Sequence, residues 1–261
     1  MDEGKNLKIA IKLTGYIFDL ESIDGVNELD SVIQCIKKFC NGDNEFYIII
    51  GGGKGARRYI QIGRDRNAPE SVLDILGIMF SRINAQLLIS LIGDKAYPDP
   101  LKDLQDAARL TGKGNILVFG GLIPGISTNA VSALVAEHLK ADMLITMTRA
   151  GALYTNDPEK DKNAKPLSRV TVKEVRKILT GSSDRAGHYP LIDQTALSII
   201  SRSKIPTRII GSDAKSLVNL LKGEKLTMAL FLFLLKSLIA FCILLFFLNG
   251  DVGWSSNKPS I

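Results

Sequence analysis

The sequence predicts an α/β fold built around a mainly parallel β-sheet. Short apolar runs rich in β-branched residues alternate with longer segments whose apolar residues recur every three or four positions. Two of these short runs end in glycine-rich turns that lead directly into a predicted helix. With 261 residues, 46% of them hydrophobic, the chain can form one large domain or two small ones. Ligands are then expected at the carboxyl ends of the strands.

Charge and cysteine content narrow the class of protein. The net charge of +6 suits an anionic ligand, but the basic residues are interleaved with 27 acidic ones and no nucleic-acid-binding motif is present. We therefore expect no nucleic-acid partner. Cys35, Cys40 and Cys242 lack metal-ligand spacing, so we expect no protein-built metal site and interpret the first two as ordinary thiols of a reduced cytoplasmic protein. The polar start of the chain predicts no signal peptide.

The first part of the chain predicts a strand–helix–strand unit. Residues 7–13 alternate in part and end at Thr14-Gly15, which predicts a strand followed by a turn. Residues 23–40 carry apolar side chains at helical spacing, and residues 46–50 are a short apolar run typical of a buried strand. Lys12 lies near the tip of the first strand, where it could reach a phosphate or be a solvated lysine.

The glycine run Gly51–Gly53 after the second strand organises this region. Glycine amides can approach an anion closely, and the start of the following helix adds a partial positive charge. Lys54, Arg57 and Arg58 bring cationic side chains to the same turns. The pattern predicts a phosphate cradle, although a strand-to-helix turn can require glycine for its geometry alone.

The rest of the chain continues the alternation of helices and strands. Helices are predicted over residues 71–92, 101–110, 129–139, 191–203 and 215–221, and strands over residues 116–119, 142–148 and 206–210. A second glycine-rich loop, Gly120–Thr128, precedes one of these helices, and its Ser127 and Thr128 can cap the helix or bind a phosphate. Thr171 and Glu174 predict a capping box for a further helix that ends at Leu179. Asp74, near a helix start, has a capping position.

Five motifs in order resemble those of the UMP kinases of the archaeal type, which belong to the amino acid kinase superfamily. They are Lys12-Leu13-Thr14-Gly15, Gly51-Gly52-Gly53 with Ala56-Arg57, Leu73–Gly77 with Ser81–Ala85, Gly120-Gly121 with Pro124-Gly125 and Ser127-Thr128, and Tyr154 with Asp157-Pro158. The resemblance covers residues 7–225. It implies a three-layer α/β/α sandwich, a cytoplasmic homohexamer, and transfer of the γ-phosphoryl group of Mg²⁺-bound ATP to UMP, giving UDP for pyrimidine synthesis.

The resemblance also assigns site residues. It implies that ATP is bound by Lys12, Thr14, Gly15, Gly53, Arg57, Thr148, Arg149, Tyr154 and Asp157. It implies that UMP is bound by Gly52, Asp74 and the segment Leu122, Ile123, Pro124, Gly125, Ile126, Ser127 and Thr128. Lys12 and Arg57 are the expected catalytic residues, because phosphoryl transfer to an ionised phosphate needs alignment and charge neutralisation and no general base.

Some positions depart from the family pattern, and three alternatives remain open. Where the family usually has Thr-Asn-x-Asp-Gly-Val-Tyr, residues 148–154 lack the amide and the carboxylate, and Tyr16 replaces a small or basic residue. The chain could instead be another small-molecule kinase of the superfamily, or an impaired paralogue that only binds nucleotides at a membrane. Gly51–Ala56 also fits the G-x-G-x-x-A dinucleotide fingerprint, but helix is predicted where that pattern expects a strand ending in an acidic residue.

The C-terminal segment predicts a second region, 226–261, after a kinase-like domain at 1–225. Residues 228–248 are long enough to cross a bilayer as a helix, and only Lys236 is charged among them. Their Leu, Phe and Ile residues favour insertion by roughly 4.5–9 kcal/mol, against about 2.5–3.5 kcal/mol for the lysine. The composition predicts a membrane anchor in place of the family's closing strand. A helix at a subunit interface and a frameshifted gene end are the alternatives.

Overall fold

The computed structural model describes residues 7–19, 23–40, 44–113, 116–156, 161–180, 192–223 and 229–232. Its centre is a seven-stranded sheet in the order β3-β2-β1-β4-β8-β9-β7. The strands are β1 (Lys8–Leu13), β2 (Glu45–Ile50), β3 (Leu117–Phe119), β4 (Met143–Thr148), β7 (Arg169–Thr171), β8 (Thr207–Gly211) and β9 (Ala229–Leu232). Strands β5 (Leu153–Tyr154) and β6 (Pro166–Leu167) form a separate antiparallel pair.

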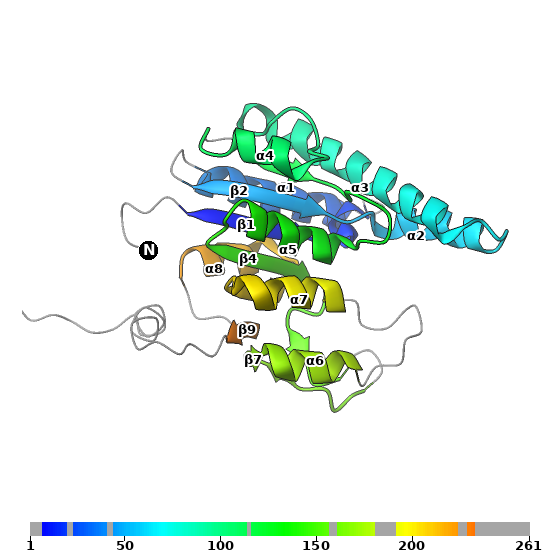
Figure 1. The fold of residues 1–261 in the computed structure, drawn as a ribbon. Helices are drawn as coiled ribbons and strands as arrows, with labels where there is room; N and C mark the ends of the chain where they lie inside the picture. The colour runs from blue at the N-terminus through cyan, green and yellow to red at the C-terminus, as the bar shows by residue number, and fades with distance from the viewer. Residues whose placement is uncertain are drawn as a thin grey trace, which may run out of the picture.

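Helices cover both faces of the sheet and make three layers (Figure 1). They are α1 (Ile23–Phe39), α2 (Gly53–Arg64), α3 (Glu70–Ile92), α4 (Leu104–Leu110), α5 (Thr128–His138), α6 (Val172–Thr180), α7 (Gln194–Ser203) and α8 (Ala214–Leu221), with 3₁₀ turns η1 (Gly15–Phe18) and η2 (Gly93–Lys95). One core cluster joins one sheet face to α5 and α7, and the other joins the opposite face to α1, α3 and α8. The predicted α/β/α sandwich is confirmed.

The five strands from β3 to β8 are parallel, as predicted. In register, Leu13 of β1 pairs with Ile50 of β2, and Lys12 pairs with Thr146 of β4. The central strands are buried on both faces, which explains why their sequences read as continuous apolar runs. Their carboxyl ends therefore meet along one edge of the sheet.

Strand β9 corrects the expectation for the C-terminal segment. Ala229–Leu232 pairs antiparallel with β8 and parallel with β7, so a helix that begins at Met228 is wrong for these four residues. A short closing strand is present after all, and it brings β7 into the sheet. Apolar residues suit both a buried strand and a membrane helix, which is why composition alone favoured the helix. The rest of the predicted anchor lies outside the described residues.

Capping groups fix several helix boundaries. The predicted capping box is confirmed, because the Glu174 amide donates to Thr171 Oγ1 (3.2 Å) and the Thr171 amide donates to Glu174 Oε2 (2.7 Å). Helix α4 begins later than predicted, since Asp103 caps it and Leu101 forms a β-bridge with Phe119. Cys35 and Cys40 are buried free thiols, as expected.

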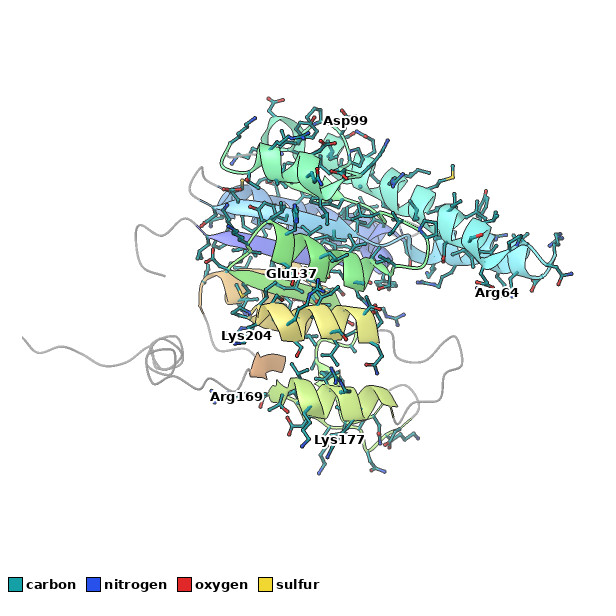
Figure 2. The ribbon with its side chains drawn as sticks, viewed as in Figure 1. Arg64, Asp99, Glu137, Arg169, Lys177 and Lys204 are labelled. Atoms are coloured by element: carbon teal, nitrogen blue, oxygen red, sulfur yellow. The ribbon has the colours of Figure 1, made fainter. Side chains whose placement is uncertain are left out.

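Charged side chains lie mainly on the outside of the layers (Figure 2). Glu137 of α5 accepts hydrogen bonds from Arg202 of α7 at 2.9 and 2.5 Å, which ties these two neighbouring helices together. Arg64, near the outer tip of the α2–α3 hairpin, donates twice to Glu70 at 2.9 Å. These pairs are largely exposed, and exposed pairs contribute little to stability.

Candidate active site

Four loops converge at the carboxyl ends of neighbouring strands β3, β2, β1 and β4. They are residues 120–128 after β3, 51–53 after β2, 14–15 after β1 and 149–152 after β4. Three of them carry the motifs that the sequence singled out for phosphate or nucleotide binding. Ligand sites of parallel α/β proteins lie at this edge, so the fold itself brings the predicted residues together.

The backbones of Gly15 and Gly53 touch. A Cβ atom added to Gly15 would lie 2.3 Å from the Gly53 nitrogen, and one added to Gly53 would lie 2.6 Å from the Gly15 oxygen. Gly53 also has φ +70, a conformation that side chains rarely adopt. Both glycines are therefore required for the loops after β1 and β2 to pack on each other. This contact supports the predicted cradle at the start of α2.

Asp19 occupies a position at this cradle that the sequence did not indicate. Its Oδ1 accepts a hydrogen bond from the Lys54 amide (3.0 Å), and its Oδ2 lies 3.8 Å from Lys54 Nζ. The Asp19 side chain is only 7% exposed. A first-turn amide of α2 is thus already bound by a carboxylate, which fixes Lys54 at the edge of the glycine loops.

Helix α3 holds the glycine loops from the other side. Asn84 Nδ2 donates to the Gly51 oxygen (2.9 Å), and Ser81 Oγ accepts from the Gly121 amide (2.7 Å). Arg82 donates to the oxygens of Gly121 (3.2 Å) and Leu122 (3.1 Å). These side chains bind backbone, so they position both loops relative to each other. The sequence showed them only as a motif, without indicating this role.

The predicted UMP-binding residues also come together. Asp74 Oδ2 accepts a hydrogen bond from the Gly125 amide (2.8 Å), which links α3 to the 122–128 loop. Asp74 lies in the second turn of α3, and the interpretation of this residue as a helix cap is therefore wrong. Pro69 is the N-cap and makes no side-chain cap bond. Ile123, Pro124 and Gly125 are exposed at the tip of the loop.

The hydroxyls of Ser127 and Thr128 have different surroundings. Ser127 Oγ caps α5 by accepting from the Ala130 amide (3.0 Å) and donates a short hydrogen bond to Asp193, the N-cap of α7. Thr128 Oγ1 instead faces the other glycine loop, 3.6 Å from the position of a Cβ on Gly51. Capping therefore explains Ser127, whereas Thr128 is oriented toward the loop after β2.

The predicted adenosine-side residues surround the end of β4. Thr148 is the last residue of the strand, Arg149 is exposed just after it, and Tyr154 Oη donates to the Ala150 oxygen (3.2 Å). This bond closes the turn between β4 and β5. Asp157 lies outside the described residues.

Lys12 and Arg57 differ in environment. Lys12 is mostly buried between Ile49 of β2 and Thr146 of β4, and desolvation lowers its pKa to about 8. Two residues further along, Thr14 Oγ1 accepts a hydrogen bond from the Tyr16 amide (3.4 Å). Arg57 is exposed on α2, one helical turn beyond Gly53. Lys12 is thus a largely buried cation near the end of β1, and Arg57 an exposed cation on α2.

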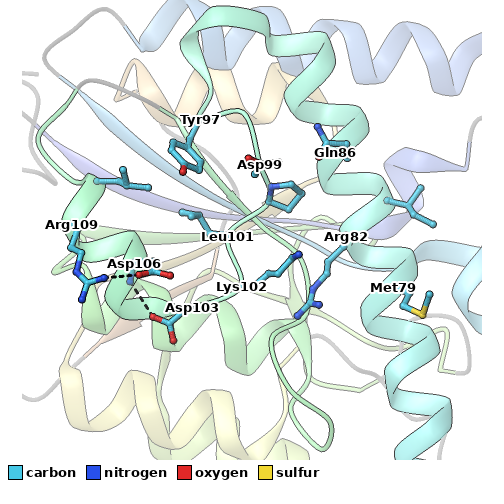
Figure 3. A pocket seen from close by; sticks show the side chains of 13 residues that line it. Met79, Arg82, Gln86, Tyr97, Asp99, Leu101, Lys102, Asp103, Asp106 and Arg109 are labelled. Atoms are coloured by element: carbon cyan, nitrogen blue, oxygen red, sulfur yellow. Dashed lines mark hydrogen bonds and ion pairs between the residues drawn. The ribbon is translucent and has the colours of Figure 1, made fainter.

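An open pocket of about 800 Å³ lies apart from the glycine loops, between α3 and the segment that includes α4 (Figure 3). Tyr97, Asp99, Lys102 and Arg109 contribute to its wall. None of its lining residues belongs to the predicted ATP or UMP set, although Arg82 reaches from it toward the 120–122 loop. In the described part of the chain, no three His, Cys, Asp or Glu side chains are grouped to hold a metal ion.

The sequence of the chain matches one known protein family. The model of the amino acid kinase family matches residues 8–211, most of the chain. The chain therefore belongs to the amino acid kinase family.

The named relatives indicate which members of the family the chain resembles. The chain is 40% identical over 222 residues to a uridylate kinase of Sulfolobus acidocaldarius, covering 84% of this chain and 96% of the relative. It is 38% identical over 220 residues to a uridylate kinase of Methanobrevibacter smithii, with the same coverages. A crystal structure of the uridylate kinase from Archaeoglobus fulgidus superposes with a TM-score of 0.75 at 31% identity, covering 85% of this chain and 98% of that one. Within the family, the similarity is to archaeal uridylate kinases.

The lowered pKa of Lys12 predicts an alkaline limit on activity. We expect the protonated Lys12 amine to supply positive charge to the phosphates, and this charge is lost as pH rises through about 8. The kcat/KM for ATP, which reports the free enzyme, should therefore fall about tenfold per pH unit above that value. Lys12→Ala should lower kcat about 10²–10³-fold at pH 7 with little change in the KM for UMP.

Lys173→Ala, an exposed substitution on α6, is the matched control for the loss of one lysine. Steady-state rates between pH 6 and 10 measure both effects. A flat profile up to pH 10, or an unchanged kcat in Lys12→Ala, would show that Lys12 does not act on the phosphates.

Proposed function

We propose that this protein transfers the γ-phosphoryl group of Mg²⁺-bound ATP to UMP, producing UDP and ADP. The observation that carries the proposal is the convergence of the loops after β1, β2 and β3, with Asp74 of α3 bonded to Gly125 in the third loop. The 40% identity to an archaeal uridylate kinase over most of the chain supports the choice of UMP as acceptor.

The geometry suits transfer between two phosphates. UMP is already ionised near neutral pH, so the protein must hold two anions in line and stabilise the moving charge. The amides of Gly15 and Gly53, the start of α2 and the Lys12 ammonium provide positive potential at one edge of the sheet. Mg²⁺ enters with the nucleotide and neutralises charge on its phosphates.

The two substrates are assigned to different loops at the carboxyl ends of the parallel strands. We assign ATP to the loops after β1 and β4 with Gly53 and Arg57, and UMP to Gly52, Asp74 and the 122–128 loop. The Gly15–Gly53 contact lies within the ATP group, and Gly52 of the UMP group directly precedes Gly53 in the chain. The Asp74–Gly125 bond gives the acceptor loop a fixed position, with Ile123 and Pro124 exposed at its tip.

A substrate panel tests this function. ADP release is measured with Mg²⁺-ATP and each of UMP, CMP, AMP, GMP and acetylglutamate. We expect UMP to give a kcat/KM at least about tenfold above the others, because a site built to hydrogen-bond one base leaves polar groups unpaired with another. A faster acceptor would assign the chain to another kinase of the family. Folded protein that binds ATP but turns over no acceptor would identify a binding module.

We also propose that the chain self-associates through α3. The outer side of this helix exposes a stripe of apolar residues, Val72, Ile75, Met79 and Ile83, and α2 adds Tyr59 and Ile62 beside it. In the described residues, the segment Glu70–Lys95 is the one helix that is long and apolar enough to span a membrane. Only 28% of its most apolar stretch is buried. Its other side packs on β2 and β3, so a second copy of the same face is the occupant that suits it. The hexamer implied by the resemblance would contain this contact.

Sedimentation velocity of a chain that ends at Leu232 tests self-association. We expect a discrete oligomer, and Met79→Asp with Ile83→Asp should reduce its mass, because burying unpaired carboxylates is costly. Ser198→Asp on α7 adds one negative charge on the opposite layer and should leave the mass unchanged. A monomeric parent chain, or variants of unchanged mass, would contradict an interface on α3.

For the C-terminal segment, we propose that residues 233–248 attach a cytoplasmic kinase domain to a membrane. The composition of the segment supports this, with Lys236 as its single charge. The reduced state of Cys35 and Cys40 suits the cytoplasm. The anchor begins after β9, since Ala229–Leu232 belongs to the sheet.

Vesicle flotation without detergent tests the anchor. The full chain should float with phosphatidylcholine vesicles, whereas a chain that ends at Leu232 should stay at the bottom, because only the full chain carries the apolar segment. Ending at Leu232 preserves β9, so the comparison does not disturb the sheet. A full chain that remains soluble as a discrete oligomer would rule out attachment.

A further inference from the structure

Two cationic side chains lie close to the ring of Tyr16, beside the glycine loops. It follows Gly15 directly, and 42% of its surface is exposed. The Arg149 Cζ lies 4.8 Å from the centre of its ring, and the Lys54 Nζ lies 5.8 Å from it. Both distances allow cation–π attraction. One ring thus links the end of β1, the start of α2 and the end of β4.

The two cations differ in how their charge is balanced. Lys54 is paired with the buried carboxylate of Asp19. Arg149 is exposed, and among the described residues it makes no ion pair within 4.0 Å. The cluster therefore has excess positive charge, and that charge belongs to the guanidinium.

A guanidinium that stacks on a ring keeps its N–H groups available. The donors lie in the plane of the group and point outward from its edge, in a fork that matches two phosphate oxygens. The stack also restricts the rotamers of a long side chain, so less entropy is lost when a ligand binds. Arg149, whose Cζ lies over the Tyr16 ring, is the candidate for such an arrangement beside the loops after β1 and β4.

We propose that Arg149 binds the phosphates of the donor nucleotide and that Tyr16 positions its guanidinium for this contact. The proposal rests on the proposed function and moves Arg149 from the adenosine side, where the resemblance put it, to the phosphate side. Its location supports this, because Tyr16 is adjacent to Gly15, and Gly15 touches Gly53 at the phosphate cradle.

Calorimetric titration with Mg²⁺-ATP and with adenosine tests the assignment. Arg149→Ala should weaken ATP binding at least about tenfold and leave adenosine binding within about twofold, because charge-assisted bonds to phosphate are lost and base contacts are not. Tyr16→Ala should weaken ATP binding severalfold, and Tyr16→Phe, which keeps the ring, should match the parent chain. Since Tyr16 acts through Arg149, the double variant Arg149→Ala/Tyr16→Ala should bind ATP no more weakly than Arg149→Ala alone.

Arg109→Ala is the matched control, because Arg109 is an exposed arginine on α4 that pairs with Asp106. Melting temperatures are recorded for every variant, and Arg149→Gln replaces any Arg149→Ala protein that is not folded. Unchanged or tighter ATP binding in the Arg149 variants would overturn the proposal, as would an equal loss for ATP and adenosine. Fully additive effects of the two substitutions would remove the positioning role of Tyr16.

The titrations need no acceptor, so they separate this inference from the proposed function. If UMP is not phosphorylated but ATP binding depends on Arg149 as described, the inference stands and the kinase assignment fails. If UMP is phosphorylated but ATP binding does not depend on Arg149, the kinase assignment stands and the inference about Arg149 fails.

Discussion

The contact between the backbones of Gly15 and Gly53 is the constraint on which the site depends. Neither position has room for a Cβ atom, and Gly53 has a positive φ as well. Because this contact joins the loops after β1 and β2, it sets where α2 begins and where Lys54 and Tyr16 lie. Strands β1 and β2 are buried on both faces, so the contact rests on closely packed strands.

Helix α3 acts on the same loops from a second direction. Its Asn84, Ser81 and Asp74 reach the backbones of the loops after β2 and β3, while its far side is apolar and exposed. One helix therefore positions the candidate site and carries the surface proposed for self-association. The proposed contact with a second copy and the loop after β3 therefore share one helix, linked to that loop by hydrogen bonds from Ser81 and Asp74.

The sequence predicted the parts of the fold that depend on local pattern. The parallel strands β1 to β4, β8 and most helices have clear apolar periodicity, and the glycine loops identify the functional edge. It did not predict β5, β6 and β7, which have only two or three residues each, and it misread β9, whose composition suits a helix in lipid equally well. Asp19 and the Asp74–Gly125 bond were also missed, because partners distant in sequence decide them.

The place of β9 in the sheet has a consequence for the order of folding during synthesis. Among the described strands, β7 pairs with β9 alone, and β9 is the last of them to leave the ribosome. The parallel half, from β1 to β8, can assemble as soon as β8 is made, whereas β7 must wait for a partner far along the chain. Late non-local pairing of this kind is slow and leaves an open strand edge in the meantime. The nascent protein thus carries all four loops of the candidate site before its sheet is finished.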